Sequence, residues 1–158
     1  MVALRATVST SSIILLCVGA LGCNREPEAP YTPGLGEIMT LTQMRHTKLW
    51  FAGEAANWPL AAYELDELKE GFDDAAKFHP THKDAPLPIP QLFTKIMTSP
   101  VGELEEAIGA KDHQRFAQAF DGLTEACNSC HRATNFGFNV VARPTANPYP
   151  NQVFQPVR

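Results

Sequence analysis

The stretch DHQRFAQAFDGLTEACNSCHRAT, from Asp112 to Thr134, decides the fold of this chain. Its larger apolar residues recur every three or four positions, so they fall on one side of a helix. They are Phe116, Phe120, Leu123, Cys127 and Cys130. Asp112 stands before them as a helix N-cap. The stretch therefore predicts one long amphipathic helix that must bury one face against other elements.

The same helix runs into Cys127-Asn128-Ser129-Cys130-His131, and C-x-x-C-H is the attachment signature of a c-type haem. Two thiols at this spacing can each add to one of the two vinyl groups on the same haem edge. The imidazole beside the second thiol can then bind the iron axially. We therefore interpret Cys127 and Cys130 as the attachment residues of one covalent haem c, and His131 as an iron ligand.

Other uses of the motif fit the sequence less well. A thioredoxin-like C-x-x-C requires a βαβ context, and the surrounding sequence has no strand pattern. A structural zinc requires four protein ligands, whereas a catalytic zinc has three and a water. The motif supplies three, and no second C-x-x-C occurs. Haem attachment is the favoured interpretation, with zinc or a disulfide between Cys127 and Cys130 as alternatives.

The N-terminus is typical of an export signal, which haem attachment outside the cytoplasm requires. Residues 13–18, IILLCV, form an apolar core that is too short for a permanent membrane span. Ala20-Leu21-Gly22-Cys23 resembles the lipobox of bacterial lipoproteins, with Ala20 where leucine is usual. We predict a signal peptide over residues 1–22 and lipidation at Cys23, with simple cleavage nearby as the alternative. The protein is then expected in the periplasm, held to the membrane by its lipid.

Residues 23–33 contain Pro27, Pro30 and Pro33 with charges and no apolar period, which predicts an extended tether. The whole chain has a formal net charge of −4, and loss of residues 1–22 would remove Arg5 and leave −5. An acidic surface argues against nucleic acid as a partner and favours a basic redox partner protein.

The thirteen prolines are placed selectively. Residues 34–58, 60–79 and 101–143 contain no proline, so helices can run through these segments. We predict helices over residues 35–56, from an N-cap at Asn57 to residue 78, over residues 89–108, and from Asp112 to the motif. The third is expected to kink or split at Pro100. The predicted fold is all-α, an antiparallel four-helix bundle over residues 34–142, followed by an extended surface tail over residues 143–158.

Two further features concern the first two helices. Six acidic residues on the second helix predict a solvated face, namely Glu64, Asp66, Glu67, Glu70, Asp73 and Asp74. Gly53 removes side-chain bulk on the apolar side of the first helix. It predicts either a close approach of a porphyrin or a close helix contact.

A four-helix chain with an export signal and its C-x-x-C-H near the end of the last helix resembles the cytochrome c′ and cytochrome c556 family. The resemblance covers residues 35–134, and its specific residues are Cys127, Cys130 and His131. It implies that His131 is the proximal ligand, that the first helix faces the other side of the haem, and that two chains can pair through their first two helices. Members called c′ have an open apolar distal site and bind gases, whereas c556 members use methionine and transfer electrons. The long tail is unusual for the family.

The first helix offers Met39, Met44 and His46 as sixth ligands. His46 and Met39 lie on its apolar side, and Met44 points roughly opposite. A buried histidine without a partner is unfavourable, and binding to iron would relieve that cost. We rank His46 first, Met39 second and an open site third. The alternative is a core histidine hydrogen-bonded to a side chain of the second or third helix, or to a haem propionate.

These features together predict an exported monohaem c-type cytochrome that carries single electrons and is not an enzyme. The alternative is a c′-like protein that binds NO or CO at an open distal site. Methionine ligation would raise the haem potential above that of a bis-histidine haem.

Overall fold

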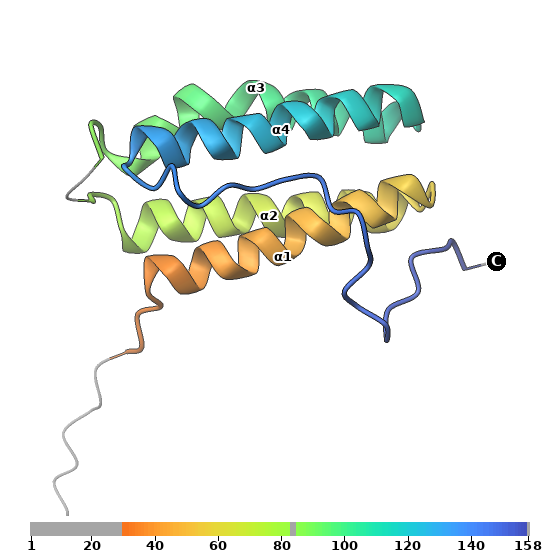
Figure 1. Ribbon diagram of the computed structural model, residues 1–158, viewed down its shortest axis with the longest axis horizontal. Coiled ribbons are helices and arrows are strands. Elements are labelled where there is room, and N and C mark those ends of the chain that lie inside the picture. Colours follow the sequence, from red (N-terminus) through yellow and green to blue (C-terminus); the bar gives the residue numbers. More distant parts are fainter. Residues whose placement is uncertain (1–29, 83–84, 158) are drawn as a thin grey trace, which may run out of the picture. The chain divides into compact units, whose positions relative to one another are not determined.

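Four helices make up the regular structure of this computed structural model, which describes residues 30–82 and 85–157. They are α1 (Leu35–Glu54), α2 (Trp58–Phe78), α3 (Ile89–Ala110) and α4 (His113–Ala133). Each helix runs antiparallel to the one before it (Figure 1). No strand occurs among the described residues. The predicted all-α class with four helices is confirmed, and the arrangement is compatible with a four-helix bundle. All four helices belong to one compact unit that begins at Thr32.

Two helices start where local capping chemistry predicts. The side-chain oxygen of Asn57 accepts a hydrogen bond from the Leu60 N–H at 3.4 Å, and Pro59 occupies the first turn of α2. At α4 the Asp112 side chain accepts from the Arg115 N–H at 3.0 Å. Each cap satisfies one of the free N–H groups at a helix start. Both N-cap predictions are confirmed.

Helix α3 is a single helix that runs through Pro100 from Ile89 to Ala110, so it is not split in two. A proline inside a helix removes one backbone hydrogen bond and costs about 3 kcal/mol. Buried residues lie on both sides of it, namely Ile89, Leu92 and Met97 before it and Leu104, Ala107 and Ile108 after it. Packing of both halves against the same core outweighs the local penalty. The predicted split at Pro100 was wrong.

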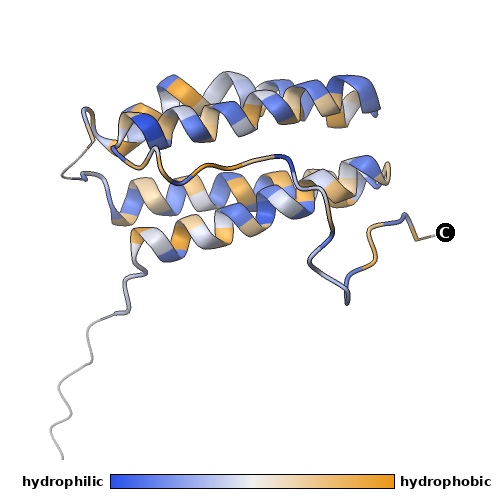
Figure 2. Ribbon diagram, viewed as in Figure 1, coloured by the Kyte–Doolittle hydropathy of each residue, from blue (hydrophilic) through white to orange (hydrophobic). Residues whose placement is uncertain are grey.

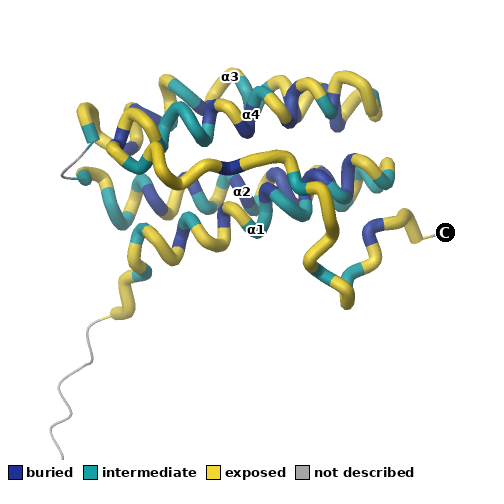
Figure 3. Tube along the Cα trace, in the orientation of Figure 1, coloured by how far each residue is buried: buried dark blue, intermediate teal, exposed yellow. Residues whose placement is uncertain are grey.

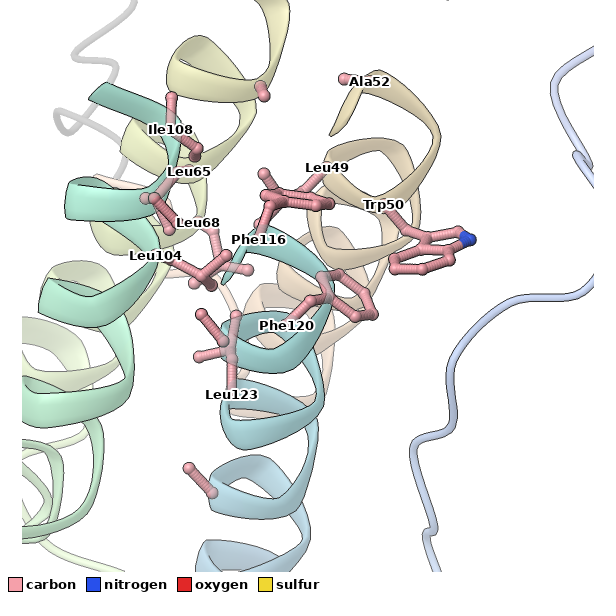
Figure 4. Close-up of a cluster of buried hydrophobic side chains, with 14 of the residues drawn as sticks. Leu49, Trp50, Ala52, Leu65, Leu68, Leu104, Ile108, Phe116, Phe120 and Leu123 are labelled. Atoms are coloured by element: carbon pink, nitrogen blue, oxygen red, sulfur yellow. The ribbon is translucent and has the colours of Figure 1, made fainter. Parts of the chain in front are cut away.

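The core is formed by apolar side chains from all four helices (Figure 4). Figure 2 shows how apolar and hydrophilic residues alternate along each helix. Helix α1 packs most closely on α2, and α3 on α4, whereas α1 and α4 have fewer contacts with each other. Gly53 on α1 lies against the ring of Phe116 on α4. Of the two roles predicted for Gly53, the structure therefore shows a close contact between helices.

The expected solvated face of α2 needs one correction. Glu64 is buried, with 1% of its side chain exposed, and its carboxylate lies 3.1 Å from Arg45 Nη1 on α1. The second Arg45 nitrogen pairs with Glu67 at 2.6 Å. Glu64 therefore belongs to the interface between α1 and α2, because Arg45 is close enough to compensate its charge.

After α4 the chain turns back on itself, and residues 136–143, here called the returning segment, run beside α4. The rest of the tail, to residue 157, has neither helix nor strand. Most residues after α4 are exposed (Figure 3), but the side chains of Val141 in the returning segment and Phe154 in the tail are buried. Phe154 packs against Phe51 with ring centroids 5.6 Å apart, and Asn57 Nδ2 donates to the Phe154 carbonyl at 3.0 Å. The tail is thus tied to both α4 and α1.

The predicted signal peptide and the lipidation residue Cys23 lie outside the described residues. Among the residues that are described, no helix is both long and apolar enough to cross a membrane.

Candidate functional site

A cavity of about 310 Å³ lies where the first half of α1 meets the last turns of α4 and the returning segment. This volume falls in the range of about 300–1,000 Å³ that is usual for small-molecule sites. Its walls are mainly apolar and come from all four helices. The larger apolar side chains include Leu35, Leu68, Phe72, Ile89, Phe93 and Met97 from the helices and Phe136 from the returning segment. Such a lining suits a large apolar ligand.

The cavity brings the predicted site residues together. Cys127, Cys130 and His131 from α4 line it, and so do Met39 and His46 from α1. Met44, the candidate ranked lowest, is not among the lining residues. Residues separated by more than eighty positions in the chain thus face the same space.

The two cysteines are not joined in a disulfide. Burial raises the pKa of the Cys127 thiol to about 12, with a smaller contribution from the neighbouring Cys130. Burial also raises the pKa of Cys130. Thiol–disulfide enzymes instead lower the pKa of the attacking cysteine. The thiol environment therefore gives no support to a thioredoxin-like use of the pair.

No three His, Cys, Asp or Glu side chains in residues 30–82 and 85–157 are grouped so that they could bind one metal ion. A tetrahedral zinc site needs at least three such converging ligands. A haem c needs only one protein nitrogen at the iron, together with two thiols beside the ring edge. Within the described residues, the arrangement of Cys127, Cys130 and His131 fits the second requirement better than the first.

The ring of His131 is oriented by a backbone group. Its Nδ1 atom lies 2.6 Å from the carbonyl oxygen of Asn139 in the returning segment. A carbonyl accepts hydrogen bonds and does not donate them, so Nδ1 carries the proton in this contact. In the neutral imidazole the lone pair is then on Nε2. Histidines that bind metals characteristically donate their other ring N–H in this way, so the residue fits the role of an iron ligand.

His46 is buried, with 3% exposure, and its Nε2 atom lies 2.8 Å from the Thr124 hydroxyl on α4. The Thr124 hydroxyl also lies 2.9 Å from the Phe120 carbonyl, to which it donates. Both contacts are satisfied when His46 Nε2–H donates to Thr124. Burial lowers the pKa of His46 to about 4, which keeps the ring neutral near pH 7. The hydrogen-bonding alternative named the second or third helix, but the partner is on α4.

His46 on α1 and Thr124 on α4 are in direct contact, so these two residues lie at the same height along the two helices. The two helices are antiparallel (Figure 1), so moving toward the start of α1 corresponds to moving toward the end of α4. Met39 is seven residues before His46, and His131 is seven residues after Thr124. Seven residues are two helical turns, about 10 Å, and return to nearly the same face. Helix geometry therefore puts Met39 level with His131 across the cavity.

Comparisons of the chain with protein-family models, curated proteins and solved structures find no significant match. The resemblance to the cytochrome c′ and c556 family therefore depends on the C-x-x-C-H motif and its place in the last turns of the fourth helix.

Several residues at the site were not anticipated from the sequence. Thr124 binds His46, Asn139 binds His131, and Asn128 binds the backbone of Val141. Thr124 is four residues after Phe120, on the apolar side of α4, so the sequence could have indicated that its hydroxyl faces the core. The Asn139 contact uses a main-chain carbonyl, which no side-chain pattern reveals.

Proposed function

We propose that this chain is a monohaem c-type cytochrome that carries single electrons. Cys127 and Cys130 hold the haem by thioether bonds, and His131 binds the iron through Nε2. The observation that carries the proposal is the shared lining of one apolar cavity by these three residues and by Met39. A bound haem supplies reversible one-electron chemistry at its iron. The chain supplies attachment, an axial nitrogen of defined tautomer, and an apolar environment that limits water.

We infer that Met39, rather than His46, is the sixth ligand. Two observations support this order. The Nε2 atom of His46 is already engaged by Thr124 at 2.8 Å, and helix geometry puts Met39 at the level of His131. A methionine thioether opposite a histidine raises the potential of the iron, which suits an electron carrier.

The cellular setting belongs to the proposal as well. The predicted signal peptide and lipidation at Cys23 would keep the protein outside the cytoplasm and beside a membrane. The net charge of −4 favours a redox partner protein with a basic docking surface.

The first experiment is expression of the full chain in an export host that matures c-type haem. A pyridine haemochrome spectrum and the intact mass are expected to report one haem bound by two thioether links. A colourless protein with the mass of the bare polypeptide, with or without lipid, would contradict the proposal.

The second experiment assigns the sixth ligand by optical and EPR spectra of the ferric holoprotein. Met39→Leu is expected to become high-spin, whereas His46→Gln is expected to stay low-spin like the wild type. Met44→Leu is the matched control, because Met44 lies on the same helix but outside the cavity. A high spin state in His46→Gln alone would return the ligand to His46. A wild type that is five-coordinate and binds CO or NO at once would favour the gas-binding function.

A further inference from the structure

The end of α4 has a capping arrangement that reverses the chain immediately after His131. Asn135 adopts a left-handed conformation with φ 67°. The Phe136 N–H donates to the His131 carbonyl at 2.7 Å, and the Asn135 N–H donates to the Arg132 carbonyl at 3.3 Å. This pair of bonds is a Schellman motif, in which asparagine replaces the more usual glycine. It directs the returning segment back along α4.

Asn128, in the middle of the C-x-x-C-H motif, holds the returning segment at two points. Its Nδ2–H donates to the Val141 carbonyl at 2.9 Å, and its Oδ1 accepts from the Val141 N–H at 2.8 Å. A carboxamide has the donor and the acceptor side by side that this double contact needs. Val141 is buried, with 9% exposure.

The carbonyl that meets His131 lies between these two fixed points. Asn139 is two residues before Val141 and three after Phe136, and its N–H donates to the Phe136 carbonyl at 2.8 Å. Its own carbonyl lies 2.6 Å from His131 Nδ1. The Schellman motif on one side and the Asn128 amide on the other therefore determine where this acceptor sits.

Resting on the proposed function, we propose that Asn128 is a positioning residue for the iron ligand His131, acting through the Asn139 carbonyl. An acceptor at Nδ1 fixes the ring orientation and increases the electron donation of Nε2. Stronger donation stabilises the ferric state and lowers the reduction potential. Asn128 of the motif thus changes the electron donation of His131 through the returning segment.

The test compares holoproteins that carry Asn128→Ala, Asn128→Asp or Ser129→Ala. Ser129 is the matched control, because it occupies the other middle position of the motif and its side-chain hydroxyl forms hydrogen bonds with the exposed Glu125 and Arg132. The reduction potential is measured by redox titration. Solvent exchange of the His131 Nδ1–H is measured by NMR in the ferrous state.

Asn128→Ala is expected to shift the equilibrium toward ferrous haem by about tenfold, which is about +59 mV for one electron. The Nδ1–H is expected to exchange faster in this variant, and Ser129→Ala should match the wild type in both measurements. Asn128→Asp retains the acceptor for the Val141 N–H but adds a negative charge that lowers the potential by itself, so it is judged by the Nδ1–H exchange rate, which should lie between those of Asn128→Ala and the wild type. If Asn128→Ala does not fold, the comparison of Asn128→Asp with Ser129→Ala decides the question.

A wild-type potential and wild-type exchange in the Asn128 variants would overturn this inference and leave the proposed function intact. A wild type without covalent haem would overturn both. The haemochrome spectrum of the wild type is therefore recorded before the variants are compared, so that the two failures are told apart.

Discussion

Gly53 on α1 lies so close to Phe116 on α4 that a methyl group at its position would come within 2.1 Å of the ring atom Cε1. Phe116 is fully buried and has no room to withdraw. We expect Gly53→Ala to lower the free energy of unfolding by about 1–3 kcal/mol, because overpacking forces shifts in a well-packed core. Urea unfolding of the protein, followed by circular dichroism, measures the change.

Gly102→Ala is the matched control for this substitution. Gly102 is inside α3, and a methyl group there meets no heavy atom within 4 Å. Alanine is a better helix former than glycine, so Gly102→Ala is expected to stabilise by about 0.5–1 kcal/mol. Equal effects of the two substitutions would contradict the close contact with Phe116.

The ion pair between Arg45 and Glu64 is expected to matter far more than exposed pairs. Arg45→Ala leaves the Glu64 carboxylate buried without its partner, which we expect to lower the free energy of unfolding by about 3 kcal/mol. The control Lys69→Ala breaks an exposed pair with Glu105 and should cost less than about 1 kcal/mol. The measurement is urea unfolding of both variants, and similar losses would argue against a special role for the buried carboxylate.

His46 is expected to make stability depend on pH. Its pKa is lowered from 6.5 to about 4 in the folded protein by burial. Between these values the unfolded chain binds a proton that the folded chain does not, so acidification favours unfolding. This contribution is complete above pH 6.5 and is lost as the pH falls through about 4, by up to about 3 kcal/mol.

His46→Gln removes the titrating ring and retains a side-chain donor for Thr124, so its stability should fall less between pH 6.5 and 4. Denaturant unfolding at several pH values gives the comparison. Parallel curves for wild type and His46→Gln would show that the histidine is not the group responsible.

Arg143 anchors the returning segment to two helices. Its Nε donates to Asp121 at 2.9 Å, and its guanidinium carbon lies 4.3 Å from the centroid of the Trp50 ring. Arg143→Ala is expected to lower the free energy of unfolding by about 1–2 kcal/mol, through loss of a charge-assisted fork and a cation–π contact. Arg143→Lys should rescue little, because an ammonium lacks the planar fork.

Arg115→Ala provides the comparison, since the exposed Arg115 pairs only with the exposed Glu106. Tryptophan fluorescence during unfolding, recorded in a Trp58→Phe background so that Trp50 is the remaining tryptophan of the chain, reports the surroundings of Trp50. An Arg143→Ala protein as stable as Arg115→Ala, with wild-type fluorescence, would mean that the tail is not anchored there.

The helices were predictable because the rules that form them act over a few residues. Proline placement located the segments of α1, α2 and α4, and Asn57 and Asp112 marked two of the helix starts as the structure has them. Of the two alternatives predicted at Pro100, the split was wrong, because packing of residues far from it in the chain keeps α3 in one piece. The prediction failed at Glu64 for the same reason, since the partner Arg45 belongs to another helix.

For the candidate site, the sequence alone was enough to predict the motif, because Cys127, Cys130 and His131 have the spacing at which two thiols and an imidazole suit one edge of a haem. The sequence did not show which residue of α1 lies level with the His131 imidazole. The contact between His46 and Thr124 shows how α1 and α4 are aligned along their length. The tautomer of His131 depends on the carbonyl of Asn139, eight residues further along the chain. Local pattern therefore specified the helices and the spacing of Cys127, Cys130 and His131. Packing between distant segments decided the register of the helices, the set of side chains that lines the cavity and the orientation of the His131 ring, because those contacts exist only after the chain has folded.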